Sequence, residues 1–176
     1  GARALGRHRA AARPRRARGA PAARAGIACA TGSTGGPKPT GVRQRNLAAM
    51  VPLVLGHWGL ADRGDVVDMV TFPMFWIIGL SAGGTVVVPP RFNPLNFWPV
   101  VREHGVTWYS AVPSMHQALL QRAQSRKDDD PAPGADTLRF IRSCSAALPP
   151  ILMTELEEQF GAPVLEAYGM TEAAHQ

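Results

Sequence analysis

The sequence predicts an α/β fold with a mainly parallel sheet and flanking helices. Short apolar segments alternate with helix-length segments along residues 26–176, and this alternation is typical of βαβ units. The 18 glycines and 16 prolines among 176 residues indicate many turns between those elements. A hydrophobic content of 45% is sufficient for one domain with its own core.

The first predicted elements surround a glycine-rich loop. Residues 26–30 are short and apolar, so they predict a strand. A helix is expected over residues 47–55, with Asn46 as its N-cap and with Pro52 limiting or kinking it. Two further strands are expected at residues 68–72 and 85–89, and the second is β-branched and bounded by Gly and Pro.

The remaining elements continue the alternation. Apolar spacing and turn residues predict, in order, a helix over 94–104 closed by Gly105, a strand over 106–109, a helix from Pro113 to about residue 124, a strand over 138–142, a helix over 149–160 ended by Gly161, and a strand over 163–167. Residues 127–134 are expected to form a solvated loop.

The formal net charge of +6 comes from the leading segment alone. Residues 1–26 contain eight arginines and no acidic residue, which leaves eleven basic and thirteen acidic residues in the remaining chain. The folded body is therefore not expected to bind nucleic acid. For residues 1–25 three interpretations stay open: a disordered arm or artefact, an organelle transit peptide without the usual serines, and an RNA-binding arm without interleaved aromatic residues.

Cysteine content and hydropathy bear on the compartment. Cys29 and Cys144 cannot form a disulfide framework, so a reducing intracellular compartment is expected. The uncharged run over residues 70–90 has the length of a membrane span, but prolines and glycines interrupt it, and buried strands and turns explain it better. We expect no membrane span and a cytoplasmic or peroxisomal location.

Residues 31–38 form a candidate phosphate-binding loop, because glycines let backbone N–H groups turn toward an anion and the hydroxyls and a lysine add donors. Its candidate ligands are Thr31, Gly32, Ser33, Thr34, Gly35, Gly36 and Lys38. The loop is expected between a strand and a helix, where ligands bind in open α/β sheets. It is not a Walker A loop, since Pro37 replaces the second glycine, and a plain surface turn is the alternative.

Residues 168–172 combine side chains suited to a nucleotide. Tyr168 offers a ring that can stack on adenine, and Gly169 permits close backbone approach beside Met170. The Thr171 hydroxyl can bind the α-phosphate, and the Glu172 carboxylate can hold Mg²⁺. The alternative interpretation is a turn that ends a strand and carries a surface glutamate.

These two motifs, in this order, resemble the signatures of the adenylate-forming superfamily, which includes acyl-CoA synthetases, luciferases and nonribosomal peptide adenylation domains. A stretch of small residues over 143–148 also fits, and the three blocks cover most of residues 26–176. The resemblance implies a partial N-terminal adenylation domain. It further implies that Tyr168 lies on adenine, that Thr171 touches the phosphate, that Glu172 binds the metal, and that Ser145 and Ala146 belong to the floor of the adenine and acyl pockets.

The sequence departs from the family pattern at three places. The glycine expected directly after Lys38 appears only at Gly41, and this insertion is expected to redirect the end of the loop. We expect that a short segment with a histidine and a helix is skipped after residues 73–75, with damage to the acyl pocket and to the packing of the sheet. The C-terminal domain, with its catalytic lysine, would follow Gln176, so the chain is expected to be a fragment.

Within the superfamily, residues 111–117, 142–147 and 165–176 look most like the oxalate–CoA ligase branch. His175 is then a candidate partner for the second carboxylate of a dicarboxylate substrate, whereas His116 is expected to be structural. The reaction implied is ATP-dependent activation of a carboxylate (oxalate, another short acid or a fatty acid) to acyl-adenylate and then acyl-CoA, with release of AMP and pyrophosphate.

The resemblance implies ATP, Mg²⁺ and CoA as the small molecules bound. Catalysis would rest on charge stabilisation by Lys38, Thr171 and Glu172 rather than on a protein nucleophile. Two alternatives remain: a truncated nucleotide-binding fragment without activity, and nucleic-acid binding through the arginine-rich arm.

Overall fold

The computed structural model of the chain describes residues 8–9, 24–30, 36, 38–61, 63–71, 76–125, 132, 134–170 and 173. The chain divides into two compact units. The first comprises Gly1–Ala10 and Asp62–Ala167, and the second comprises Ala11–Ala61 and Tyr168–Gln176.

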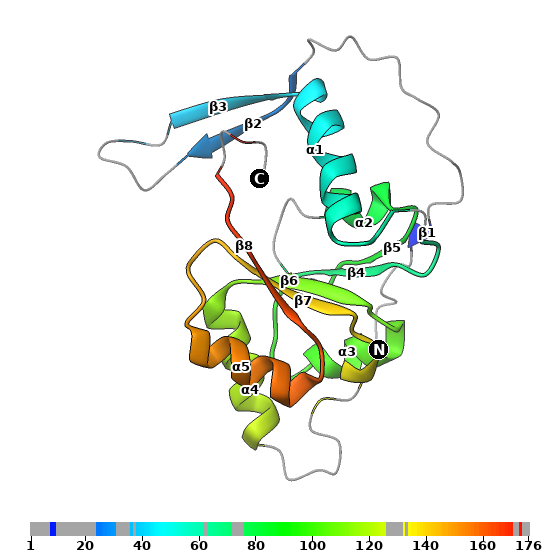
Figure 1. The fold of residues 1–176 in the computed structure, drawn as a ribbon, viewed down its shortest axis with the longest axis vertical. Coiled ribbons are helices and arrows are strands. Elements are labelled where there is room, and N and C mark those ends of the chain that lie inside the picture. Colours follow the sequence, from blue (N-terminus) through cyan, green and yellow to red (C-terminus); the bar gives the residue numbers. More distant parts are fainter. Residues whose placement is uncertain are drawn as a thin grey trace. The chain divides into compact units, whose positions relative to one another are not determined.

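The first unit is built on a sheet whose described strands have the order β1-β5-β4-β6-β7-β8 (Figure 1). The parallel strands are β4 (Val67–Val70), β5 (Thr85–Val87), β6 (Trp108–Ala111), β7 (Phe140–Cys144) and β8 (Val164–Ala167). The two-residue strand β1 (His8–Arg9) joins β5 in the antiparallel direction. The predicted α/β class and its mainly parallel sheet are therefore confirmed.

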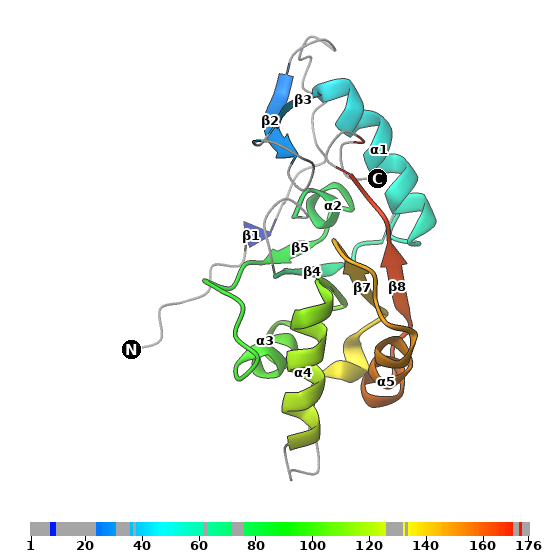
Figure 2. The ribbon, with the colours of Figure 1, turned by 90° about the vertical axis from the view of Figure 1, so that its left-hand side faces the viewer.

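Three helices cover one face of this sheet (Figure 2): α3 (Phe97–His104), α4 (Pro113–Ser125) and α5 (Pro150–Phe160). A short 3₁₀ helix, η1 (Ala135–Thr137), precedes β7. The core combines sheet and helix side chains that are at most 1% exposed, among them Met69, Tyr109, Ile141, Trp98, Leu119 and Leu156. In α4 the buried residues recur at the helical spacing that the sequence showed, so burial of one face explains this helix.

The ends of these helices follow from local backbone chemistry. Gly105 and Gly161 close α3 and α5 with φ angles of 58° and 66°, a left-handed conformation that costs glycine little. Helix α3 begins at Phe97, later than predicted, because residues 94–96 form a turn. In that turn the Asn93 side chain accepts a hydrogen bond of 2.9 Å from the Leu95 N–H.

The connection from β4 to β5 contains the short helix α2 (Trp76–Ser81), on the face of the sheet opposite α4 (Figure 2). The sequence suggested that a short segment with a histidine and a helix had been skipped after residues 73–75. The described part of this connection contains a six-residue helix, and the parallel pairing of β4 with β5 is intact. The helix packs closely on β4, because a Cβ atom at Gly79 would lie 2.6 Å from Asp68 Cβ. Residues 72–75, just before α2, lie outside the described residues.

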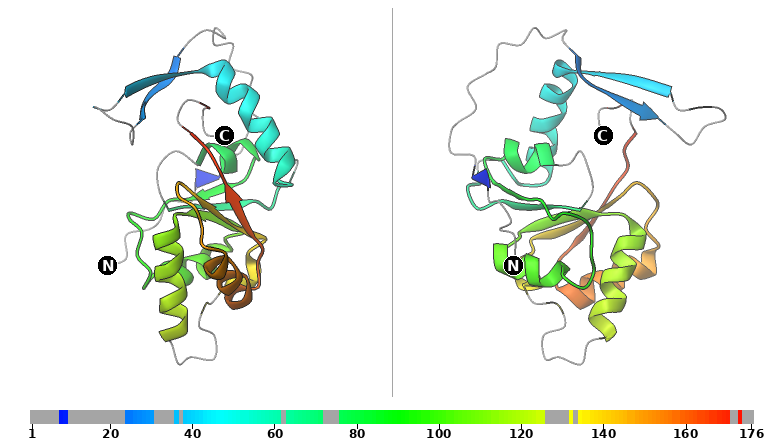
Figure 3. Two further views of the ribbon diagram at one scale, coloured as in Figure 1. Left: turned by 60° about the vertical axis from the view of Figure 1, so that its left-hand side comes forward. Right: turned by 180° about the vertical axis from the view of Figure 1, so that it is seen from behind.

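The second unit contains a β-hairpin and one longer helix (Figure 3). Strand β2 (Arg24–Ala30) pairs antiparallel with β3 (Lys38–Arg43), and α1 (Gln44–His57) follows directly. The strand predicted at 26–30 is confirmed, but β3 was not predicted. Asn46 is not the N-cap: it occupies the third helical position, where its Oδ1 accepts the Arg43 N–H at 2.9 Å.

The long uncharged run over residues 70–90 contains the end of β4, helix α2 and strand β5. Within the part of the chain that the structure describes, no helix is both long and apolar enough to cross a membrane. Of the leading residues 1–25, only β1 and the first two residues of β2 are described.

Candidate functional site

The candidate site residues fall into three blocks, and only part of each is described. The described ones are Gly36, Lys38, Ser145, Ala146, Tyr168, Gly169 and Met170. The predictions for Thr31, Gly32, Ser33, Thr34, Gly35, Thr171, Glu172 and His175 lie outside the described residues.

The candidate phosphate loop connects the two strands of the hairpin. Ala30 ends β2 and is the register partner of Lys38, which begins β3. The expected position between a strand and a helix is therefore wrong: the loop turns the chain back onto an antiparallel partner. Lys38 is exposed at the start of β3, and Gly36 is exposed as well.

The apparent insertion after Lys38 has a place in this hairpin. Pro39 and Thr40 lie inside β3 and pair with Cys29 and Ala28. In the described two-stranded sheet each strand has one unpaired side, and such edge strands tolerate proline, which has no N–H to donate. The two residues extend β3, and they follow Lys38 rather than lengthen the loop itself.

The second block begins where β7 ends. Ser145 follows Cys144 with a φ angle of 71°, the single non-glycine residue with positive φ among the described residues. This left-handed conformation costs a non-glycine residue about 1–2 kcal/mol. It turns the chain sharply off the strand, so that residues 145–149 lead from β7 to α5. Ser145 and Ala146 are both exposed on this turn.

The third block begins where the neighbouring strand ends. Cys144 and Ala167 are register partners in the parallel pair of β7 and β8, and Tyr168 follows Ala167 directly in the chain. The Tyr168 side chain is 84% exposed and the Met170 side chain 50% exposed. Neither fills the apolar core, so their chemistry is available to a ligand.

One side-chain hydrogen bond joins the ends of β7 and β8. The Leu148 N–H donates to Glu166 Oε1 at 2.8 Å. Leu148 is buried, whereas Glu166 is exposed. Glu166 lies within residues 165–176, which resemble the oxalate–CoA ligase branch, but no role was assigned to it from the sequence, although a charged residue in an apolar strand two positions before Tyr168 was a usable signal.

A buried polar group that the sequence reasoning also missed lies on the sheet face opposite α4. Asp68, Ser110 and Arg142 are each at most 3% exposed and come from three neighbouring strands. Arg142 donates through Nη1 to Ser110 Oγ at 3.3 Å. Burial raises the pKa of Asp68 well above its usual value, and the Gly79 backbone N–H and the Arg142 charge oppose that shift. Burial also lowers the pKa of Arg142.

His116 is structural, as expected from its position at the start of a helix. It is 0% exposed, and its ring centroid lies 5.8 Å from that of Tyr109. Burial lowers its pKa to about 4, with backbone carbonyl groups of Arg142 and Ala111 acting in the opposite direction. The imidazole is therefore neutral near pH 7.

Strand order places a ligand crevice at the same edge as these strand ends. The chain passes from β4 to β5 on one side and from β6 to β7 on the other, so the strand order reverses between β4 and β6. Ligands of open α/β sheets bind beyond the carboxyl ends of the strands at such a point. A cavity of about 280 Å³ opens beside the ends of β4 and β5, with Thr71, Arg91 and Asn93 among its lining residues.

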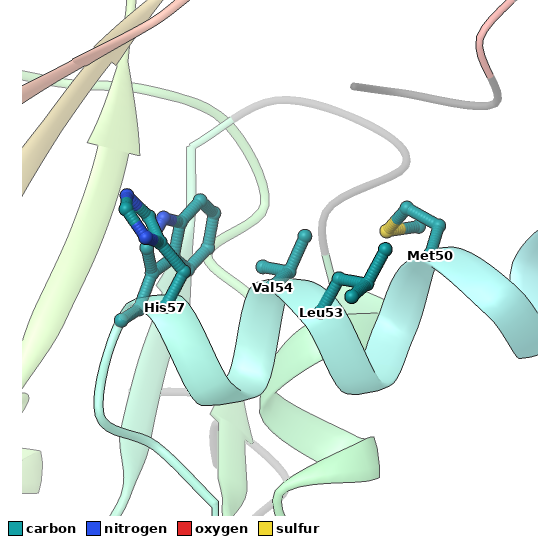
Figure 4. A pocket seen from close by; sticks show the side chains of 5 residues that line it. Met50, Leu53, Val54 and His57 are labelled. Atoms are coloured by element: carbon teal, nitrogen blue, oxygen red, sulfur yellow. The ribbon is translucent and has the colours of Figure 1, made fainter.

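A separate apolar pocket of about 390 Å³ lies along α1 (Figure 4) and is lined by Met50, Leu53, Val54, His57 and Trp58. None of these residues belongs to the three candidate blocks. Across the described ranges, no group of three or more His, Cys, Asp or Glu side chains could hold a metal ion.

Comparisons with known proteins converge on one family. A family model described as AMP-binding enzyme matches residues 7–176. The oxalate–CoA ligase of Arabidopsis thaliana is 42% identical over 155 residues, covering 82% of this chain and 29% of that protein. The oxalate–CoA ligase of Saccharomyces cerevisiae is 37% identical over 156 residues, covering 83% of this chain and 27% of that protein.

The fold is similar to that of a solved CoA ligase. The O-succinylbenzoate–coenzyme A synthetase of Bacillus subtilis, in complex with AMP, superposes with a TM-score of 0.73 at 25% identity, covering 89% of this chain and 32% of that one. The chain thus spans less than a third of the length of these relatives. The family match begins at residue 7, within the arginine-rich segment.

Proposed function

The chain belongs to the family of AMP-binding enzymes, and from this premise we propose that its parent protein is a carboxylate–CoA ligase. In the first step a carboxylate attacks the α-phosphate of ATP, which gives an acyl-adenylate and releases pyrophosphate. In the second step the CoA thiol attacks the acyl carbon, the bond to AMP breaks, and acyl-CoA is formed.

The observation that carries the proposal is that two motif blocks begin directly after the ends of two neighbouring parallel strands. Cys144 and Ala167 end neighbouring parallel strands and are register partners. Ser145 follows Cys144 in the sequence, and Tyr168 follows Ala167. The carboxyl edge of an open α/β sheet is where nucleotides bind. An exposed aromatic ring and small residues suit an adenine, which needs a flat partner and room.

The roles of individual residues follow from their chemistry. Lys38 would bring its ammonium to the β- or γ-phosphate, and the hydroxyls of Thr34 and Thr171 would donate to phosphate oxygens. Such groups would stabilise the charge that develops on the α-phosphate and on the departing pyrophosphate. The exposure of Lys38 supports this role, because the side chain is not engaged in the core.

Glu172 is the proposed protein ligand for Mg²⁺. This ion commonly takes one or two carboxylates and completes its coordination with water and substrate phosphates, so the magnesium site would form with the nucleotide. When bound, the ion neutralises phosphate charge, and Glu172 would hold it at the end of the segment that begins with Tyr168.

Oxalate is the substrate that we propose first, because two relatives with 42% and 37% identity are oxalate–CoA ligases. A short dicarboxylate needs a hydrogen-bond donor for the carboxylate that does not react, and His175 would provide it. Other short acids and fatty acids are the alternatives, and the assay below distinguishes them.

A second candidate function is supported by the length of the chain. Because it spans less than a third of its relatives, this chain by itself would bind nucleotide without completing the reaction. Calorimetry with Mg-ATP on the 176-residue chain tests that alternative, and turnover by this chain would refute it.

The decisive experiment for the ligase proposal is ATP–pyrophosphate exchange by the full-length parent protein. Oxalate should support exchange and CoA thioester formation, and a Thr171→Ala variant should lose most of both. Malonate, acetate and a long-chain fatty acid serve as comparison substrates. The absence of exchange with every carboxylate would refute the ligase proposal, and exchange with a fatty acid alone would refute the assignment of oxalate.

A further inference from the structure

The connection that follows β7 is joined to β8 by a carboxylate to which no role was assigned from the sequence. Glu166 lies in β8 two residues before Tyr168, and its Oε1 accepts the Leu148 N–H at 2.8 Å. Leu148 belongs to the connection between β7 and α5 (Figure 2), which starts with the left-handed residue Ser145. One side chain therefore ties the turn after β7 to the strand that precedes Tyr168.

Among the described residues, two side-chain hydrogen bonds involve the turn: Ser145 Oγ donates to Cys144 Sγ at 3.7 Å, and the Leu148 N–H donates to Glu166 Oε1. Ser145 and Ala146 are exposed, and Ser145 is in a conformation that a non-glycine residue adopts at a cost. Leu148 is 5% exposed, so its side chain anchors the far end of the turn in the core. Its N–H would lose its carboxylate partner in a part-buried position if Glu166 were removed, and unpaired groups of this kind are costly.

We propose that Glu166 is a positioning residue for nucleotide binding: it holds the turn at Ser145–Ala146 in the shape that receives the adenine. This inference rests on the proposed function, because that function assigns Ser145 and Ala146 to the nucleotide pocket. Glu166 acts through the Leu148 backbone and is not assigned any contact with the nucleotide.

The chain contains a matched control at the other end of the same strand. Glu157 Oε1 accepts the Val164 N–H at 2.8 Å, so it makes the same kind of bond at the start of β8. Removing either carboxylate deletes one bond to a backbone N–H, that of Leu148 in the connection after β7 or that of Val164 at the start of β8. Only Glu166 is next to the turn that carries the site residues, so a purely structural role predicts equal effects of the two changes on binding.

The test compares Glu166→Ala, Glu166→Gln and Glu157→Ala in the 176-residue chain, with calorimetry of AMP and Mg-ATP binding and with thermal unfolding. We expect Glu166→Ala to weaken nucleotide binding about tenfold, the ratio that corresponds to losing one hydrogen bond to a charged group. Glu166→Gln keeps an acceptor oxygen and should bind within about threefold of the unmodified chain. Glu157→Ala should lower the unfolding temperature but leave binding unchanged.

Equal binding by Glu166→Ala and the unmodified chain would overturn the inference. So would equal weakening by Glu157→Ala, or a loss in Glu166→Gln as large as that in Glu166→Ala. Hydrogen exchange of the Leu148 amide separates this inference from the proposed function. Failure of the unmodified chain to bind nucleotide refutes nucleotide binding by this chain, the second candidate function, whereas an unprotected Leu148 amide refutes the hydrogen bond between Glu166 and Leu148.

Discussion

Burial shifts the proton affinity of His116 and Asp68 in opposite ways. The pKa of His116 falls from 6.5 to about 4, so protonation opposes folding and the stability contribution is lost as pH falls through that interval. The pKa of Asp68 rises above 3.8, so ionisation opposes folding and its contribution is lost as pH rises from that value. At mildly acidic pH, His116 and Asp68 therefore change the stability of the first unit in opposite directions as the pH changes.

Replacing His116 should remove its contribution to the pH dependence of the unfolding free energy. The shift of the His116 pKa from 6.5 to about 4 corresponds to about 3 kcal/mol of stability lost between these pH values. In His116→Leu the midpoint of urea unfolding should depend less on pH between 6.5 and 4.5 than in the unmodified chain. Asp68→Asn serves as the comparison, because without the opposing contribution of Asp68 the stability should fall more steeply as the pH decreases. An unchanged profile in His116→Leu would contradict this assignment.

Lys38 allows a direct test of the phosphate loop at the residue scale. Its side chain is exposed, so Lys38→Ala should leave the unfolding temperature unchanged. The same change should weaken Mg-ATP binding about tenfold, as expected for one hydrogen bond between charged groups. Arg45→Ala is the matched control, because Arg45 is an exposed cation of the same unit outside the loop. Equal weakening by both variants would indicate nonspecific charge attraction.

At the scale of elements, the short helix α2 and the hairpin of β2 and β3 show how local propensity is overridden. Six residues are too few for a helix to be stable alone, and α2 depends on close packing against β4 through Gly79. Pro39 and Gly41 weaken the strand tendency of β3, yet β3 forms because β2 provides a pairing partner along its length.

Gly79 tests the packing of α2 on β4. In Gly79→Ala the new Cβ would lie 2.6 Å from Asp68 Cβ and 2.8 Å from Asp68 Oδ2, so we expect a loss of about 1–3 kcal/mol in the free energy of unfolding. The control is Gly56→Ala in α1, where nothing lies within 4 Å. There the change should stabilise the chain by about 0.4–1 kcal/mol, because alanine favours the helix and restricts the unfolded chain. Denaturant unfolding measures both, and equal effects would refute the packing argument.

At the scale of the whole molecule, the chain combines the complete run of β4 to β8 with a separate unit that carries the candidate phosphate loop. It corresponds to less than a third of the length of its relatives. Nucleotide binding and the complete ligase reaction are therefore separate questions, and the first can be tested on the chain itself.

Mg-ATP should stabilise the chain if it binds the folded state alone. At a concentration of 100 times Kd the gain is about 2.7 kcal/mol, which corresponds to a rise of roughly 5–10 °C in unfolding temperature for a chain of this size. Mg-CTP at the same concentration is the control, because the proposed pocket is shaped for adenine. The same rise with both nucleotides would point to binding through phosphates alone, and no rise with Mg-ATP would contradict nucleotide binding by this chain.

The fold class, most elements of the first unit and the family could be predicted from the amino-acid sequence alone. Periodicity, turn glycines such as Gly105 and Gly161, and short motifs are local properties, and each can be detected within a few residues. Three features could not be predicted in this way: the candidate phosphate loop joins two antiparallel strands, α2 forms, and Glu166 accepts a hydrogen bond from Leu148. Those features depend on contacts between residues distant in sequence, such as Pro39 with Cys29 or Glu166 with Leu148. Pairing and packing energies of that kind outweigh local propensity. They cannot be predicted from a short stretch of sequence, because each depends on residues from two separate segments.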